Sequence, residues 1–76
     1  MKLRSIKANM TEVSVNADLT VLFSYRTPVA CHISGDGYSR TEKKWSATTT
    51  RHINQWVQGS AKEKPQSFFD ELVEQV

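Results

Sequence analysis

The sequence predicts a small α+β domain: an antiparallel β-sheet of three to five strands, followed by two C-terminal α-helices packed on one face. Two observations predict this fold. Apolar and polar residues alternate from Val13 to Ile33, whereas after Trp45 the apolar residues recur at helical spacing. The 76 residues are 38% hydrophobic, which is enough for one core, so residues 1–76 are expected to form a single small domain.

The alternating segment predicts strands with one apolar face. Its odd-numbered positions from 13 to 25, and again 29, 31 and 33, are apolar or aromatic, and Leu22 interrupts the polar set between them. Turn residues at 16–18 and 26–28 divide the segment into about three strands. The turn at 34–37 predicts a further strand around residues 38–41, and residues 2–7 are a candidate edge strand.

Two helices are predicted after the strands. Ile53, Trp56 and Val57 lie on one stripe of the first helix, with Ser46 as its N-cap and Gly59 at its end. The second helix starts near residue 65, after a short polar link over 61–64, and carries an apolar stripe from 68 to 76. These apolar faces can cover the sheet, but the core is thin for a stable monomer, so a homodimer is also considered.

Several classes of protein are excluded by composition. The single cysteine, Cys31, excludes a disulfide framework, and neither His32 nor His52 has further ligands at metal-binding spacing. Cys31 and His32 are adjacent on a predicted strand, so their side chains point to opposite faces and make a poor catalytic pair. We therefore expect a protein that is not an enzyme, with no catalytic residues, metal or cofactor; whether either histidine has a functional role stays open.

The targeting signals are equally sparse. No apolar run approaches the roughly 18–20 residues that a membrane span needs, and the first ten residues, MKLRSIKANM, lack the apolar centre of a signal peptide. These features predict a protein of the cytoplasm with no membrane partner.

Residues 38–52, YSRTEKKWSATTTRH, are the most informative segment because they carry a local charge of +3. Lys43 and Lys44 precede the predicted first helix, whose first turn has no carboxylate, so an anion could bind at its positive end. The simpler interpretation is that the hydroxyl side chains cap the helix and the lysines are solvated. The predicted partner or anion-binding residues are Arg40, Lys43, Lys44, Ser46, Thr48, Thr49 and Arg51, with Tyr38 as a candidate stacking residue.

Three stretches of the sequence resemble a known family. The residues TPVA at 27–30, KWS at 44–46 and TTTRHINQW at 48–56 are similar to a family of small tailed-bacteriophage proteins of unknown function. The resemblance implies a phage or prophage accessory protein that acts in the cytoplasm of a bacterial host. Such accessory proteins take over the host, counter its defences, or assist phage DNA metabolism.

Two partners are compatible with this surface. One is a bacterial host protein, bound by a non-enzymatic module; the alternative is nucleic acid, bound electrostatically by the basic 40–51 segment. A net charge of +2 and a pI of 8.9 are low for a dedicated DNA-binding protein, which favours the host protein.

Overall fold

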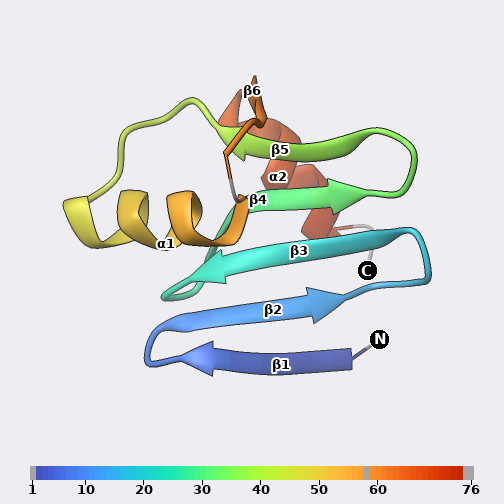
Figure 1. Cartoon of the computed structure of the whole chain (residues 1–76), viewed down its shortest axis with the longest axis horizontal. Helices are drawn as coiled ribbons and strands as arrows, with labels where there is room; N and C mark the ends of the chain where they lie inside the picture. The colour runs from blue at the N-terminus through green and yellow to red at the C-terminus, as the bar shows by residue number, and fades with distance from the viewer. Residues whose placement is uncertain (1, 58, 75–76) are drawn as a thin grey trace.

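The computed structural model describes residues 2–57 and 59–74, which form one six-stranded sheet with a helix on each face (Figure 1). The first five strands form an antiparallel meander in sequence order: β1 (Lys2–Lys7), β2 (Met10–Ser14), β3 (Leu19–Ser24), β4 (Thr27–Ile33) and β5 (Gly37–Thr41). Three further elements follow: helix α1 (Ala47–Val57), strand β6 (Lys62–Lys64) and helix α2 (Gln66–Glu74). Neither helix is long and apolar enough to cross a membrane.

The α+β class and the two C-terminal helices are confirmed, but the sheet is larger than predicted and is mixed. The segment predicted to be a polar link contains β6, which pairs parallel to β5. Its register places Ser39 beside Lys62 and Thr41 beside Lys64, and the backbone N–H of Glu42 donates to the carbonyl of Lys64 at 2.9 Å. A strand of three residues held by backbone hydrogen bonds needs no apolar alternation, so the pattern could not reveal it.

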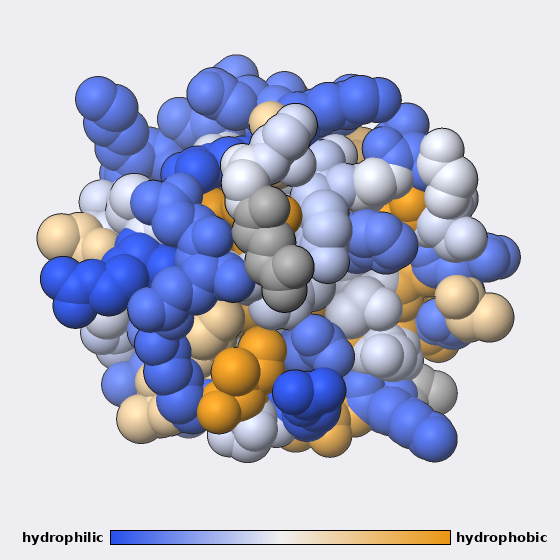
Figure 2. Space-filling view, in the orientation of Figure 1, coloured by the Kyte–Doolittle hydropathy of each residue, from blue (hydrophilic) through white to orange (hydrophobic). Residues whose placement is uncertain are grey.

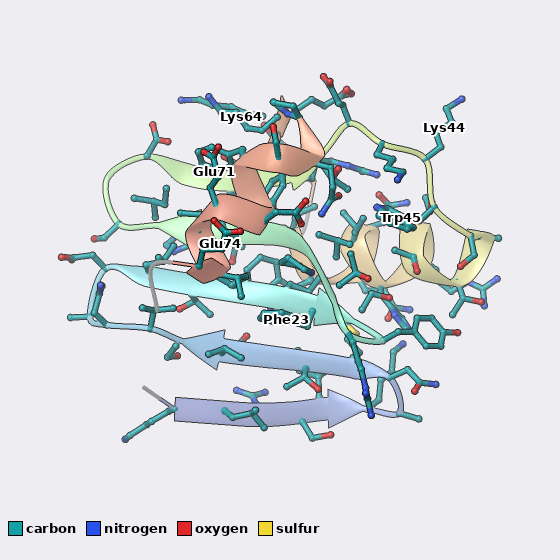
Figure 3. All side chains as sticks on the ribbon, turned by 180° about the vertical axis from the view of Figure 1, so that it is seen from behind. Phe23, Lys44, Trp45, Lys64, Glu71 and Glu74 are labelled. Carbon is teal, nitrogen blue, oxygen red and sulfur yellow. The ribbon has the colours of Figure 1, made fainter. Side chains whose placement is uncertain are left out.

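The prediction that both helices pack on one face is wrong. Helix α1 packs on one face through Ile53 and Val57, which join a cluster with Leu22 of β3. Helix α2 packs on the opposite face, where Phe69 contacts a cluster that includes Val21. Figures 1 and 3, which view the molecule from opposite sides, show α1 in front of the sheet and α2 behind it.

Both faces of the central strands are buried, because apolar residues occur at odd-numbered and at even-numbered positions of β3 and β4. Leu22, in the phase predicted to be polar, is fully buried beneath α1 together with Met10 and Ala30. A β-bulge then moves Val29 to the same side, since Leu22 pairs with Ala30 while Phe23 pairs with Pro28. The result is a three-layer arrangement of helix, sheet and helix.

Candidate functional site

The antiparallel topology brings three connections to the same end of the sheet. These are the turns at 8–9 and 25–26 and the segment at 42–46, which follow β1, β3 and β5. The backbone N–H of Tyr25 donates to the carbonyl of Asn9 at 2.7 Å, so the first two turns touch. We call this region, from residues 7–9, 25–26 and 42–51, the turn end; it lies at the left of Figure 1.

Basic residues are concentrated at the turn end. It contains five basic residues against the single carboxylate Glu42, a net charge of +4, whereas the rest of the chain has five basic and seven acidic residues, a net charge of −2. Figure 2 shows hydrophilic side chains gathered over α1 and the loop before it. The five cations are Lys7, Arg26, Lys43, Lys44 and Arg51, all of them exposed.

The two helices add to this asymmetry. Helix α1 begins at the turn end, and α2 begins nearby, because the Gln66 side chain donates to the carbonyl of Pro28 at 2.8 Å and accepts from the Trp45 indole at 3.2 Å. Neither helix has an acidic residue in its first turn, so their positive ends are not offset there. Glu71 and Glu74 lie farther along α2, away from Lys44 and Trp45 (Figure 3).

A hollow of about 330 Å³ lies between the segment at 42–46, α1 and β6. The ammonium of Lys43 lies 4.3 Å from the ring centre of Trp45, within the range of a cation–π contact. The β5–β6 register sets Glu63 beside Arg40, a carboxylate that sequence reasoning missed because β6 was not predicted. The hollow is lined by three basic, two acidic and three other residues: Arg40, Thr41, Glu42, Lys43, Lys44, Trp45, Thr50 and Glu63.

Some of the predicted anion-binding residues are exposed, and others are buried or already hydrogen-bonded within the protein. Lys43, Lys44, Thr48 and Arg51 are exposed. Ser46 caps α1, since its Oγ accepts from the backbone N–H of Thr49 at 3.3 Å.

Three other predicted residues already have partners within the fold. Thr49 is on the buried side of α1, where its hydroxyl contacts that of Ser24, so it cannot contribute to an exposed surface. Arg40 donates to Oδ1 of Asn54 at 2.8 Å. Tyr38, the candidate stacking residue, packs between His32 at 4.6 Å and Trp56 at 5.3 Å between ring centres, so its ring is engaged within the protein.

Tyr25 and Arg26 are surface residues that sequence reasoning missed. They form the two-residue turn between β3 and β4, and the Tyr25 side chain is 51% exposed. Tyr25 has a φ of 61°, a conformation that bulky residues rarely adopt and that favours glycine or asparagine. Glycine or asparagine would make a more stable turn here, so the exposed tyrosine is not explained by the stability of the turn.

The groups with the most reactive chemistry are buried and bonded. Ser24 Oγ lies 3.0 Å from Thr49 Oγ1 and 2.9 Å from His52 Nδ1, and all three residues are buried between β3 and α1. Burial, and then the charges of Lys7 and Arg51, lower the pKa of His52, so the ring is neutral within the fold. The trio therefore fastens α1 to the sheet.

Cys31 is also buried, beneath α2. Burial is the main reason that the pKa of its thiol is raised to about 11, and the charge of Asp36 adds to the effect. A thiol with this pKa carries almost no thiolate at neutral pH, so it is a weak nucleophile. Within residues 2–57 and 59–74, no three His, Cys, Asp or Glu side chains are grouped closely enough to hold a metal ion.

Comparison with known proteins identifies a family but no characterised relative. No curated protein and no solved structure matches the chain. Residues 1–71 match the model of DUF8033, which is described as a family of unknown function. Because this match covers nearly the whole sequence, the chain belongs to the DUF8033 family.

Proposed function

We propose that this protein is a non-enzymatic binding module whose turn end docks on an acidic surface of a bacterial host protein. The observation that carries the proposal is the charge distribution: a net +4 at the turn end against −2 elsewhere. Such asymmetry steers association with a negatively charged partner and fixes the orientation in which the two proteins meet.

The side chains at this end suit a protein interface. Tyr25, Arg26 and Trp45 belong to the residue types that dominate the binding energy of protein interfaces. Five strands at about 4.8 Å spacing give this end a width of roughly 20 Å, comparable to a small protein contact. Tyr25 is largely exposed and Trp45 is half-buried, with Lys43 resting against its ring.

The burial of the reactive groups supports binding over catalysis. Ser24 and His52 stand at hydrogen-bonding distance, as in a nucleophile–base pair, but both are buried between β3 and α1, where a substrate could not reach them. Cys31 is held as a neutral thiol by its burial. These groups are used for stability, which leaves the exposed surface as the functional part of the molecule.

The setting within the proposal follows from the resemblance to small tailed-phage proteins. The protein is proposed to act in the cytoplasm of an infected bacterium as a host-takeover or anti-defence factor. A protein target is favoured over nucleic acid because the half-buried Tyr38 ring already packs against His32 and Trp56. In addition, Glu63 lies beside Arg40, which weakens the basic 40–51 segment as a phosphate-binding strip.

Pull-down from a bacterial lysate with the doubly substituted Lys43→Glu, Lys44→Glu protein tests this proposal. The wild-type protein is expected to retain a specific host protein in the presence of nuclease, and the variant is expected to lose it. Both lysines are exposed, and the gain from carboxylates near the positive end of α1 offsets the lost Lys43–Trp45 contact, so the variant should unfold at about the same urea concentration as wild type. Glu71→Lys, Glu74→Lys is the matched control, which inverts two charges on α2 and should retain the partner.

Two results would contradict the proposal. One is a folded Lys43→Glu, Lys44→Glu variant that binds the same host protein at full strength. The other is wild-type binding to a fluorescent oligothymidylate whose affinity falls with a log–log salt slope of about −3, as expected for neutralising roughly four single-strand phosphates. That slope would identify nucleic acid as the partner.

A further inference from the structure

Strand β1 is an open edge of the sheet. It stands first in the strand order and pairs with β2, so alternate backbone N–H and C=O groups along its other side face outward. Every residue of β1 is exposed except Ile6, which is half-buried. Such an edge can accept one more strand from another molecule.

On the α2 side, the part of the sheet next to this edge is mainly apolar. Helix α2 packs mainly against β4, so within residues 2–57 and 59–74 it does not cover β1 and β2 on that side (Figure 3). Leu3 lies beside Val13, and Phe23 lies beside Thr11 as the diagonal neighbour of Val13. These side chains line a hollow of about 290 Å³. Leu3 is 72% exposed. Edge strands usually avoid exposed apolar side chains because these promote aggregation, so an exposed leucine here indicates a binding surface.

The other face of the same edge is basic. Arg4 lies on the α1 side, where it lines a separate hollow with Glu12 and Trp56. Lys2 is two residues before Arg4 and therefore lies on the same face of the strand. Lys7 is the last residue of β1, and β1 contains no carboxylate. Glu12 on the neighbouring strand accepts a hydrogen bond from the Trp56 indole at 2.8 Å, so part of its acceptor capacity is already in use.

From these observations we propose that β1 binds an extended segment of a partner protein in which acidic and apolar residues alternate. The segment adds a seventh strand to the sheet, with carboxylates beside Lys2 and Arg4 and apolar side chains in the hollow at Leu3. The bulge between Ser5 and Lys7 interrupts the register, so regular pairing extends over residues 2–5. This surface adjoins the turn end, because the hollow at Leu3 is also lined by Tyr25 and Arg26, and Lys7 belongs to both.

A second copy of the chain fits the edge poorly. Antiparallel pairing of two β1 strands would bring six cations together across one pair of strands, and like charges in facing positions destabilise a sheet. The same cations favour a strand that carries carboxylates. The charge of β1 thus selects an acidic occupant and opposes self-association.

The test uses the whole protein, labelled with nitrogen-15, and three short peptides at low salt. Acetyl-Glu-Val-Glu-Val-Glu-amide should shift the amide resonances of residues 2–5 and of Val13 and Phe23, and should slow hydrogen exchange at alternate β1 amides. Acetyl-Lys-Val-Lys-Val-Lys-amide should not bind. A glutamate peptide N-methylated at alternate residues should also fail, because it cannot donate the inter-strand hydrogen bonds.

Charge reversal locates the binding. Lys2→Glu, Arg4→Glu should weaken the glutamate peptide by about tenfold. Lys43→Glu, Lys44→Glu changes the net charge equally and should leave its affinity within about twofold at 0.15 M salt, where charges beyond about 8 Å are screened. Equal loss in both variants, equal binding of the N-methylated peptide, or a wild-type dimer that forms through β1 would overturn the proposal. None of these results depends on whether the turn end binds a host protein.

Discussion

The hydrogen bonds that join Ser24, Thr49 and His52 show how single residues fix the position of α1. Buried polar side chains destabilise a fold unless they find partners, and these three satisfy one another. Ser24→Ala should lower the free energy of unfolding by about 2 kcal/mol, because it removes the partner of His52 Nδ1 and one of the two hydrogen bonds of Thr49 Oγ1. Urea unfolding measures this loss. Ser5→Ala, in exposed β1, is the control and should change stability by less than about 0.5 kcal/mol.

His52 should also make stability depend on pH. Its pKa is lowered in the fold, so the unfolded chain binds a proton more readily than the folded protein does. Stability is therefore complete above the unfolded pKa of about 6.5 and falls as pH drops below it. The groups that face the ring and oppose its charge are Lys7 and Arg51.

Urea unfolding at pH 8 and pH 5.5 measures this dependence. The His52→Gln variant should lose most of the difference between the two pH values, although it is less stable at both. The Ser5→Ala variant, whose substitution lies in exposed β1, should keep the difference. An unchanged pH dependence in His52→Gln would contradict the assignment.

Cys31 should report on opening of the α2 face. Its burial and its pKa of about 11 predict that thiol reagents react with it at pH 8 far more slowly than with a free cysteine. The rate should rise steeply across the urea unfolding transition. Rapid labelling of the fully native protein would show that α2 leaves the sheet without global unfolding.

At the level of elements, the strands and helices with a regular apolar pattern were predicted, and the strand without such a pattern was missed. The alternation from 13 to 33 and the stripe at Ile53, Trp56 and Val57 correctly predicted strands and helices. Leu22 interrupts the polar phase of this alternation because it belongs to a second buried face of the sheet, the one that α1 covers. Strand β6 depends on pairing with a distant strand, which no local pattern records.

Among the described residues of α2, Phe69 is the one that is fully buried. Phe69 is fully buried against Val21 and Cys31, whereas the adjacent Phe68 is half-buried. Phe69→Ala should lower the free energy of unfolding by about 3–5 kcal/mol, and Phe68→Ala by clearly less. Thermal and urea unfolding of the two variants test this order. Equal losses would mean that the helix is held along its whole length.

At the level of the whole molecule, the site was predicted only in part. Lys43, Lys44 and Arg51 were identified from a local excess of charge, and the structure leaves them exposed. The contributions of Lys7, Tyr25 and Arg26 could not be foreseen, because only the alternating direction of the strands brings residues so far apart in sequence to one end. Topology, more than any motif, creates this surface.

The charge asymmetry should be measurable without a partner. The doubly substituted Lys43→Glu, Glu74→Lys protein keeps the net charge of +2 but moves a cation from the turn end to the far part of α2. It should elute from a cation exchanger at lower salt than wild type, because a column binds the most positive face of a protein. Identical elution would show that net charge alone governs the interaction.

The two tryptophans lie in different environments and provide a built-in optical readout. The Trp56 indole donates to Glu12 beneath α1, and the Trp45 indole donates to Gln66 at the start of α2 beside the turn end. Replacing Trp56 by phenylalanine would leave Trp45 as the single tryptophan in the sequence, which can be excited selectively at a wavelength that tyrosine does not absorb. Its emission would then respond to a molecule docking at the turn end, and Trp45→Phe would isolate the signal of the α1–sheet contact. The fluorescence of the two single-tryptophan variants can thus show which surface binds a partner without any attached dye.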